Sequence, residues 1–258
     1  MQPMQITAYV AGSIALARPE DLALDGLLSY QILRRHFGEE FYFLPDPREH
    51  LLFCRLPLEM RGDPSPRIQN MRTGDRWIVP AENIADKSLW YWACSSAQIE
   101  VKGRDTQYWN KRFDTQASLS DHIDFGGKVE KILIEQGRYK AYHMPLPTLV
   151  CDKVTWYAYG DIDKVSDLLK DIRACAKKRS YGNGSILRWE ITQIQEDWST
   201  WKVNKLMRPL PRQLGASVQW ELFDMQHTAF RAPQWHPGNQ TMCVTKGQRL
   251  ARNRATTA

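Results

Sequence analysis

Apolar residues in the first sixty positions follow strand and helix patterns in turn. Residues 5–16 are rich in β-forming residues that partly alternate with polar ones, which predicts a strand. Residues 26–37 carry apolar residues at helical spacing and end at Gly38, which predicts a helix. Residues 51–58 form another apolar run and predict a strand, with Pro57 near its end. The chain therefore begins in the order β-α-β.

The same order returns after residue 128. The expected elements are a hairpin of residues 129–135 and 138–146, a strand at 153–159, a helix at 161–176, and strands at 185–194 and 218–223. Asp161 or Asp163 can cap the helix, whose apolar residues recur at helical spacing.

Without the stretch between them, these elements form two β-α-β units. This order is typical of the ferredoxin-like split βαβ fold, so the expected fold class is α+β. We expect one domain over residues 1–195, with an insertion at about 61–127, and a C-terminal extension over residues 196–258. The last dozen residues are basic and polar, and we expect them to form a disordered tail.

The turn between the second helix and the last strand is the first candidate site. Its residues are Lys177, Lys178, Arg179, Tyr181, Gly182, Asn183 and Gly184. Glycine and asparagine tolerate positive φ, and successive N–H groups in such a turn can surround an anion. With Arg188 on the next strand, the turn predicts a nucleic-acid backbone as ligand, with an unstacked base nearby. On this interpretation Gly184→Val impairs assembly more than folding.

The alternative interpretation of this turn is purely structural. Lys and Arg are favoured at the C-terminal end of a helix, and Gly is the usual residue just beyond it. An ordinary helix-to-strand turn with a solvated basic end has the same residue types.

The insertion holds a second group of basic residues. Residues 61–88 contain several Gly and Pro residues, with five interleaved candidates: Arg61, Arg67, Arg72, Arg76 and Trp77. A long insertion inside a domain is more often functional than idle, so we expect a thumb-like arm that contacts RNA or a neighbouring subunit. Lys111 and Arg112 add two cations beside Tyr108 and Trp109 in the polar stretch that follows. The alternative is a solvated loop.

Composition narrows the class of partner. The formal net charge of +6 and the pI of about 9.0 suit an anionic partner. A hydrophobic content of 43% and a charged content of 25% are typical of a globular chain. The five cysteines form no CxxC pair, so neither a disulfide framework nor a Cys-rich zinc site is indicated. The sequence has no signal-peptide pattern and no apolar run of membrane-spanning length, so we expect a cytoplasmic protein, with no metal and no cofactor.

Short motifs in a fixed order along the chain carry a family resemblance. They are Leu24-Asp25-Gly26-Leu27-Leu28, Tyr91-Trp92-Ala93-Cys94-Ser95, Gly137-Arg138-Tyr139-Lys140-Ala141-Tyr142, Trp156-Tyr157-Ala158-Tyr159-Gly160-Asp161, residues 177–184 and Arg208-Pro209-Leu210-Pro211. With a Gly-rich loop in a ferredoxin-like core, they resemble the RAMP superfamily of CRISPR-associated proteins, and within it the type IV (Csf-type) effector subunit related to the Cas-five family. The resemblance covers most of residues 5–212. The loop is shorter than in many relatives, so we expect it to hold fewer phosphates.

The resemblance implies a non-catalytic, RNA-holding role. Members of this family cap one end of a filament of backbone subunits and grip the 5′ handle of the guide RNA (crRNA). They lie beside the large subunit, near the place where target DNA is first inspected. The expected partners are therefore the crRNA, the backbone-forming subunits, the large subunit, and target DNA near its flanking motif. Base pairing with the guide reads the target sequence, and the protein reads shape.

The main alternative is an enzyme of the same superfamily. Some relatives are metal-independent endoribonucleases that process precursor crRNA with a His as general acid or base. His36 and Tyr30 are the candidates here. They are six positions apart, about 600° around a helix, so they do not share a face. An RNA-binding module that acts alone is a further alternative.

Two other kinds of site are weakly indicated. His227, His236 and Cys243 could hold a metal, but they lack the tight spacings of a zinc site. Gly182 and Gly184 do not indicate a nucleotide-binding enzyme, because they follow a helix and no GK[ST] sequence lies nearby.

Overall fold

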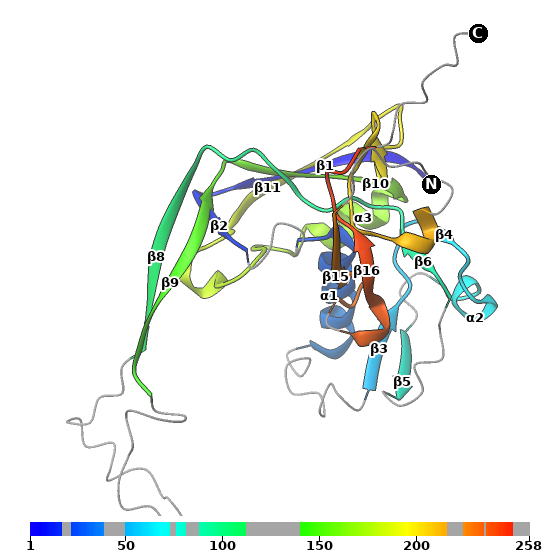
Figure 1. Ribbon diagram of the computed structural model, residues 1–258, viewed down its shortest axis with the longest axis horizontal. Helices are drawn as coiled ribbons and strands as arrows, with labels where there is room; N and C mark the ends of the chain where they lie inside the picture. Colours follow the sequence, from blue (N-terminus) through cyan, green and yellow to red (C-terminus); the bar gives the residue numbers. More distant parts are fainter. Residues whose placement is uncertain are drawn as a thin grey trace, which may run out of the picture.

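A computed structural model describes most of the chain. The described residues are 1–16, 22–38, 50–72, 76–80, 88–111, 140–215, 224–234 and 236–249, with the backbone alone described at 50–53, 67, 76–80 and 215. The fold is mixed α/β, with mostly antiparallel sheets and few helices (Figure 1). No helix among these residues has the length and apolar character needed to cross a membrane.

A four-stranded sheet forms the centre of the fold. Strand β1 (Gln2–Val10) lies between β10 (Lys153–Gly160) and β11 (Ile186–Gln193), and β7 (Gln98–Ile99) pairs with the other edge of β10. The order is β11-β1-β10-β7, and every neighbouring pair is antiparallel. The strands predicted at 153–159 and 185–194 are thus confirmed. The strand predicted at 5–16 ends at Val10, and a separate β2 (Ser13–Ala15) follows.

Two helices pack beneath this sheet in Figure 1. Helix α1 (Leu24–Phe37) confirms the predicted helix over 26–37. Helix α3 (Ile162–Leu169) is joined to it by Arg35, whose guanidinium lies 2.5 Å from the Asp167 carboxylate. The Asp161 side chain caps α3 by accepting a hydrogen bond of 3.1 Å from the Lys164 N–H.

Helix α3 ends earlier than its sequence pattern predicts. The pattern continues to Ala176, but the chain leaves the helix after Leu169. Ala174 instead forms a β-bridge with Ser185, and the Cys175 N–H donates to the Gly184 carbonyl at 2.9 Å. Pairing with the chain that leads into β11 therefore overrides the local helix propensity.

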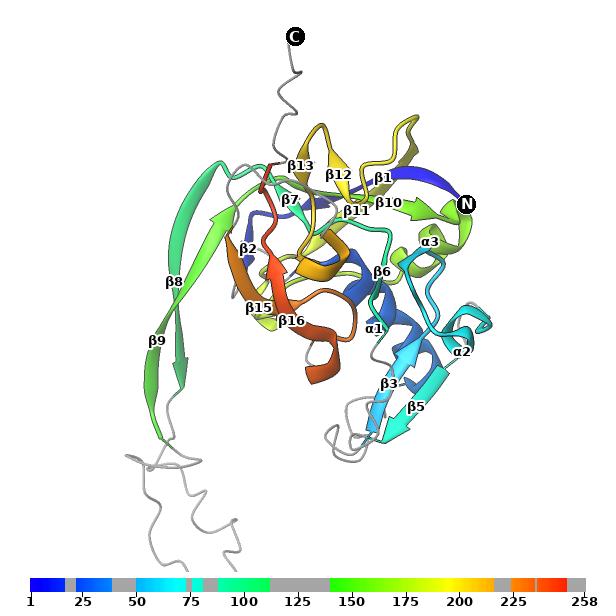
Figure 2. The same cartoon turned by 45° about the vertical axis from the view of Figure 1, so that its right-hand side comes forward.

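A long hairpin projects from the body of the molecule. It consists of β8 (Gly103–Lys111) and β9 (Tyr142–Val150), and β2 pairs with the base of β9 (Figures 1 and 2). Of the hairpin predicted at 129–135 and 138–146, the first strand lies outside the described residues. The structure pairs β9 with β8, in the stretch interpreted as a polar part of the insertion. Pairing of β9 with residues 129–135 stays a prediction.

Residues 50–92 form two small two-stranded sheets. Strand β3 (His50–Cys54) pairs with β5 (Arg76–Pro80), and β4 (Met60–Gly62) pairs with β6 (Trp90–Trp92). A short helix, α2 (Pro66–Gln69), lies between them in sequence.

These pairings bear on two predictions. The strand predicted at 51–58 is interrupted: β3 ends at Cys54 and pairs with β5, whereas Leu58 forms a β-bridge with Gly160 at the end of β10. Strand β7 pairs with the beginning of β10. In residues 61–88, β5 pairs with β3 and the end of β4 pairs with β6. The interpretation of this stretch as a thumb-like arm stays a prediction. The projecting element is the β8–β9 hairpin.

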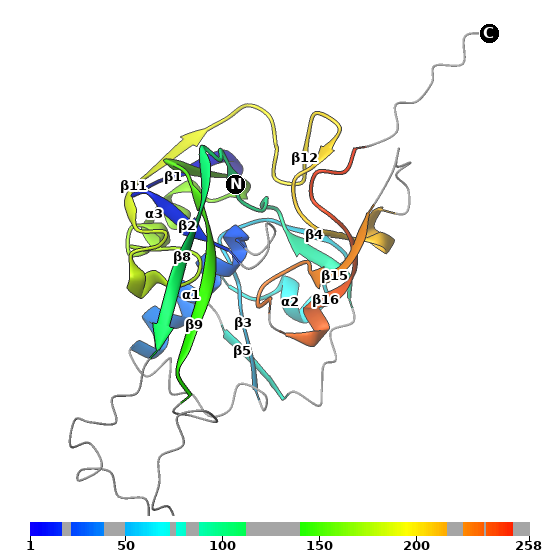
Figure 3. The ribbon, with the colours of Figure 1, turned by 60° about the vertical axis from the view of Figure 1, so that its left-hand side comes forward.

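The C-terminal part builds two further small sheets. In one, β12 (Trp201–Lys202) pairs with β13 (Lys205–Leu206). The other contains β14 (Leu210–Pro211), β15 (Met225–Ala229) and β16 (Gln240–Val244), and short 3₁₀ turns lie at Arg212–Gly215 and Pro237–Asn239. Strands β14, β16 and β15 pair in that order, and in Figure 3 β15 and β16 lie on the side of the molecule away from β11. The strand predicted at 218–223 lies outside the described residues.

Two hydrophobic clusters correspond to these two parts. The larger one fills the space between the central sheet and the helices, and includes Leu28, Trp92 and Trp156. The smaller one lies under the C-terminal strands and includes Tyr91 and Phe230. Full burial of each such side chain contributes roughly 1.5–3 kcal/mol, so the larger cluster dominates stability.

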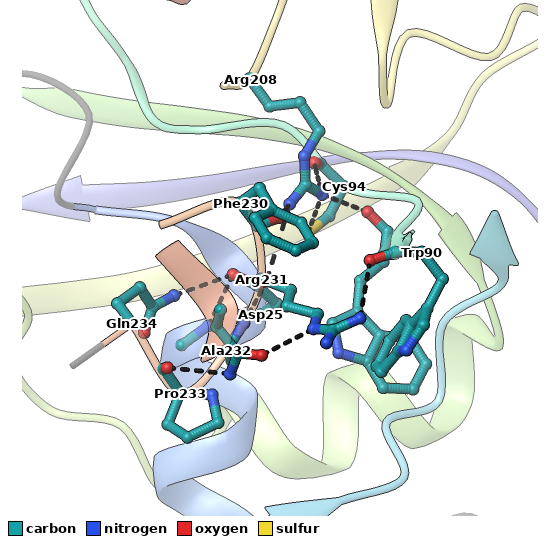
Figure 4. A network of polar contacts seen from close by, with 12 residues as sticks. Asp25, Trp90, Cys94, Arg208, Phe230, Arg231, Ala232, Pro233 and Gln234 are labelled. Atoms are coloured by element: carbon teal, nitrogen blue, oxygen red, sulfur yellow. Dashed lines mark hydrogen bonds and ion pairs between the residues drawn. The ribbon is translucent and has the colours of Figure 1, made fainter. Parts of the chain in front are cut away.

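Two buried arginines join the C-terminal strands to the rest (Figure 4). The Arg208 guanidinium donates to the carbonyls of Trp92, Cys94 and Phe230, the Cys94 bond being 2.8 Å. The Arg231 guanidinium donates to the Trp90 carbonyl at 3.3 Å and to that of Ser88 at 3.0 Å.

Asp25, at the start of α1, completes this network. Its carboxylate lies 3.8 Å from the Arg208 guanidinium and accepts hydrogen bonds from the N–H groups of Gly26 and Ala232 and from Gln234 Nε2. Burial raises the pKa of Asp25, although Arg208 and the two N–H groups act in the opposite direction. We define these three side chains, Asp25, Arg208 and Arg231, as the buried ion network.

Replacing Arg208 with Leu is expected to destabilise the fold strongly. The change leaves the Asp25 carboxylate buried without its cation, which costs about 3–5 kcal/mol. The measurement is urea unfolding of the full chain. Arg212→Leu is the control, since Arg212 is exposed and its loss should change the unfolding free energy by less than about 0.5 kcal/mol.

This defect should depend on pH. A buried carboxyl with a raised pKa stabilises the fold less as the pH rises through the range between its unfolded and folded pKa values. Without Arg208 the pKa of Asp25 rises further, so the difference between variant and wild type should be larger at about pH 7 than at about pH 5. An equal difference at both pH values would show that Asp25 is not the group left unpaired.

Candidate nucleic-acid interface

The predicted basic turn lies where three parts of the chain meet. We call residues 177–184 the basic loop. It contains a 3₁₀ turn at Arg179–Tyr181, flanked by Lys178 and Gly182 with φ of 56° and 82°. Its backbone is tied to β2, because the Lys177 N–H donates to the Ala15 carbonyl at 2.9 Å.

Two of the three cations of the basic loop lie over aromatic rings, and none of the three pairs with a carboxylate of the described residues. Lys178 Nζ lies 2.8 Å from the centre of the Trp109 ring on β8, and the Arg179 guanidinium lies 5.3 Å from that of Tyr30 on α1. No ion pair joins residues 177–179 to any residue that the structure describes. Tyr181 is 53% exposed beside them. A cation over a ring keeps its charge available to an anion, whereas a salt bridge would neutralise it.

Two N–H groups of this loop already have acceptors within the protein. The Gly182 N–H donates to the Arg179 carbonyl at 3.0 Å, and the Gly184 N–H donates to the Ser13 carbonyl at 2.7 Å. The side chain of Asn183 is buried, donates to Gln107 Oε1 at 3.0 Å and accepts from Ser13 Oγ at 2.9 Å. These three residues shape the loop, and contact of its N–H groups with phosphate stays a prediction.

Two predicted arginines lie in ion pairs elsewhere. Arg61 is half-buried and contacts the carboxylates of Glu59, at 2.8 Å, and Asp197. Arg188 pairs with Glu190 at 2.8 Å, and its guanidinium lies 3.5 Å from the centre of the Tyr9 ring. Both pairs compete with any phosphate, so neither arginine matches the free cation expected from the sequence.

The remaining predicted residues are spread over other elements. Arg67 is on α2, Arg72 is exposed just after it, Arg76 and Trp77 are in β5, Lys111 is at the end of β8, and Arg112 lies outside the described residues. The side chains of Arg67, Arg76 and Trp77 are not described, and Lys111 Nζ lies 5.9 Å from the centre of the Tyr142 ring. RNA contact by these residues stays a prediction.

A cavity opens beside the basic loop. Its volume is about 510 Å³, and it lies between the start of α1, residues 174–179 and the end of β15. Lys177, Arg179 and Tyr30 are among the residues that line it, and the buried ion network forms part of its wall.

The alternative sites do not assemble among the described residues. His36 is exposed and packs edge-on against Phe37, whereas Tyr30, on another face of α1, lines the cavity. In the described part of the chain, no group of three or more His, Cys, Asp or Glu residues could hold a metal ion. His236 instead accepts a hydrogen bond from the Gly238 N–H, and the Cys243 thiol donates to the Thr228 carbonyl.

Comparison with known proteins identifies the class. A family model described as CRISPR type IV associated protein Csf3 matches residues 59–246. This match covers well over half of the chain, so the protein is a CRISPR-associated protein of type IV. It belongs to the Csf3 family, which confirms the resemblance found in the sequence.

Other comparisons are more distant. Among solved structures, one match is the Csm3-Csm4 subcomplex in the type III-A CRISPR-Cas interference complex, with 10% sequence identity and a TM-score of 0.37, covering 98% of this chain and 93% of that chain. No protein with curated annotation matches the chain.

Sequence reasoning missed the residues that complete the site. The sequence indicates Tyr30 only as a catalytic candidate and Trp109 only as a neighbour of Lys111. Neither ring is close to the basic loop in sequence, and only the fold brings them under Lys178 and Arg179. The family motifs contain Asp25 and Arg208, but nothing in their spacing indicates that they meet.

The two glycines of the basic loop should differ sharply in their tolerance of alanine. A Cβ at Gly184, with φ of +68°, would lie 2.0 Å from the Cys175 carbonyl oxygen, whereas a Cβ at Gly182 would meet nothing within 4 Å. Gly182→Ala should cost only the strain of positive φ, about 1–2 kcal/mol. Gly184→Ala should cost more than about 3 kcal/mol by urea unfolding, because backbone must move.

This comparison reverses the expectation that Gly184 serves assembly. If Gly184→Ala unfolds no more easily than Gly182→Ala, the close backbone contact with Cys175 is not a constraint on folding.

Proposed function

We propose that this protein is a non-catalytic RNA-binding subunit of a type IV CRISPR effector ribonucleoprotein, and that its basic loop holds the 5′ handle of the crRNA. The observation that carries the proposal is the set of three cations at 177–179. None of them is neutralised by a carboxylate of the described residues, and two lie over aromatic rings. Cations beside exposed rings are the usual means of binding single-stranded nucleic acid.

We further propose that the central sheet with α1 and α3 is a ferredoxin-like core of the RAMP type. Its elements follow the chain order β1-α1-β7-β10-α3-β11 and the sheet order β11-β1-β10-β7. This is the arrangement that a split βαβ fold requires. In this scheme residues 1–195 are the core domain and residues 196–258 the extension.

The proposed partners follow from family membership. The protein would cap a filament of backbone subunits, lie next to the large subunit and take part in crRNA-guided DNA targeting in the cytoplasm, near the motif that flanks the target. We also propose the β8–β9 hairpin as an arm, because it projects from the body (Figure 2). Trp109, in the outer half of β8, contacts Lys178 of the basic loop.

The first test removes the three cations. Lys177, Lys178 and Arg179 are replaced together by Ala, and binding of the full chain to synthetic crRNA is measured by fluorescence anisotropy over a range of salt concentrations. Each lost phosphate contact should reduce the slope of log K against log salt by roughly 0.7, so the slope should fall by about 2.

The matched control removes three exposed lysines outside the basic loop, Lys102, Lys153 and Lys164. This variant has the same net charge as the first and should keep the wild-type slope. Equal slopes for wild type and both variants would contradict the proposal.

The second test concerns the absence of catalysis. General acid–base cleavage needs a base at the 2′-hydroxyl and an acid at the leaving oxygen, and Tyr30 and His36 lie on different faces of α1. Purified protein incubated with labelled precursor RNA, with and without Mg²⁺, should leave the RNA intact. Site-specific cleavage that is lost in His36→Ala or Tyr30→Phe would overturn this part and identify a processing endoribonuclease.

A further inference from the structure

Strand β11 forms one edge of the central sheet. It pairs with β1 on one side, and from residue 187 onward no described residue pairs with its other side. The beginning of the strand is taken, because the Ile186 N–H donates to the Arg173 carbonyl at 2.8 Å and Ser185 forms a β-bridge with Ala174. The open edge is therefore residues 187–193, and β11 lies at the left margin of the molecule in Figure 3.

Alternation along the strand shows which backbone groups face outward at this edge. The Ile194 N–H donates to the Pro3 carbonyl at 3.1 Å, so the even-numbered positions of this part of β11 direct their backbone groups toward β1. The N–H and C=O groups of Trp189 and Ile191 therefore point away from the sheet, and neither N–H has an acceptor in the described part of the chain. An unpaired edge of this kind is a template for another strand.

The charges of this edge suit a second copy of the same strand. Antiparallel pairing of two copies centred on Trp189 places Arg188 of each chain opposite Glu190 of the other. Within one chain, the Arg188 guanidinium lies 2.8 Å from the Glu190 carboxylate on an exposed face of the sheet. The two copies together therefore form a group of four alternating charges. A register centred on Arg188 or Glu190 would instead place like charges opposite each other, which is unfavourable.

Apolar side chains favour the same register. Leu187 is 72% exposed, and it comes opposite Ile191 of the second copy. The two half-buried Trp189 side chains come opposite each other, and cross-strand aromatic pairs stabilise a sheet. The paired stretch is then residues 187–191 on both chains, which is the part of the edge that the Arg173 carbonyl leaves open.

We propose that β11 pairs with β11 of a second copy of this chain, antiparallel and centred on Trp189, so that the two central sheets become one continuous sheet. The pairing covers an edge that would otherwise recruit other strands without selection. Five residues on each side bury less than a standard protein interface, so the dimer is weak and depends on concentration. This proposal goes beyond the proposed function, since it concerns the free chain and needs no RNA.

The test is sedimentation velocity of the full, RNA-free chain over a concentration range of about 1–200 µM, where weak dimers form. The wild type should pass from monomer to dimer as its concentration rises. Arg188→Glu and Glu190→Arg each place like charges opposite each other twice, so each should weaken the dimer at least about tenfold. Lys164→Glu is the control, because it makes the same change of charge on α3, where the side chain is 61% exposed. This control should dimerise as the wild type does.

A mixture of the two β11 variants should dimerise again. In the register centred on Trp189, the two glutamates of one chain face the two arginines of the other, so the mixture forms a heterodimer that neither variant forms with itself. A change confined to one chain cannot produce this result, because neither variant alone has both charges.

An independent measurement uses cysteine pairs and decides the question if the charge variants fail to fold. Chains carrying Arg188→Cys and Glu190→Cys are mixed under a mild oxidant. In this register the two positions form a pair without backbone hydrogen bonds, whose Cα atoms are about 4.5 Å apart, within the range of a disulfide. The five native cysteines are buried and should not compete. A disulfide should join the two chains, and Lys164→Cys in place of Arg188→Cys should abolish it.

Three results would overturn the proposal. They are a wild type that stays monomeric at every concentration, a dimer that both charge variants leave unchanged, and a mixture that dimerises no better than its components. If the wild type is monomeric and the β11 amides become protected from hydrogen exchange only when backbone subunits are added, the edge belongs to a neighbouring subunit and not to a second copy.

Discussion

The buried ion network is the constraint on which the relation between the two parts of this protein depends. Two guanidiniums enter the interior from the C-terminal part, and each needs acceptors there because a buried charge without partners is strongly destabilising. The carbonyls of residues 88–94 and the carboxylate of Asp25 provide them. Since Asp25 begins α1 and Arg208 precedes β14, the network fixes these elements against each other and shapes the cavity between them.

Local sequence patterns were sufficient to predict the elements that bury one periodic apolar face. The helix over 26–37 and the strands at 153–159 and 185–194 were predicted because each has a periodic apolar face. The second strand of the core was not, since β7 has only two residues and no pattern of its own. The sequence indicates an irregular polar stretch at β8, because most of its side chains are exposed and apolar and polar residues do not alternate along it. Pairing partners so distant in sequence depend on the whole fold.

In the candidate site, too, some features could be predicted from the sequence and others depend on the whole fold. The charge of a side chain can be read from the sequence, so the cations at 177–179 can be identified there. Which acceptor a backbone N–H bonds depends on the residues that the fold places beside it. Ser13 lies there, accepts from the Gly184 N–H and supports Asn183, so the Gly184 N–H already has an acceptor within the protein. Trp109 and Tyr30 were not assigned to this site because ring partners of a cation carry no signature in the spacing of residues.

The backbone contact between Gly184 and Cys175 has a kinetic consequence. The loop is locked against β2 and the end of α3 before any ligand arrives, so the ordering entropy that a flexible loop would lose on binding is lost during folding instead. Association with a polyanion is then governed by diffusion and by long-range attraction to the three cations, without a slow rearrangement step. Differences in affinity among ligands should therefore appear mainly as differences in the lifetime of the complex.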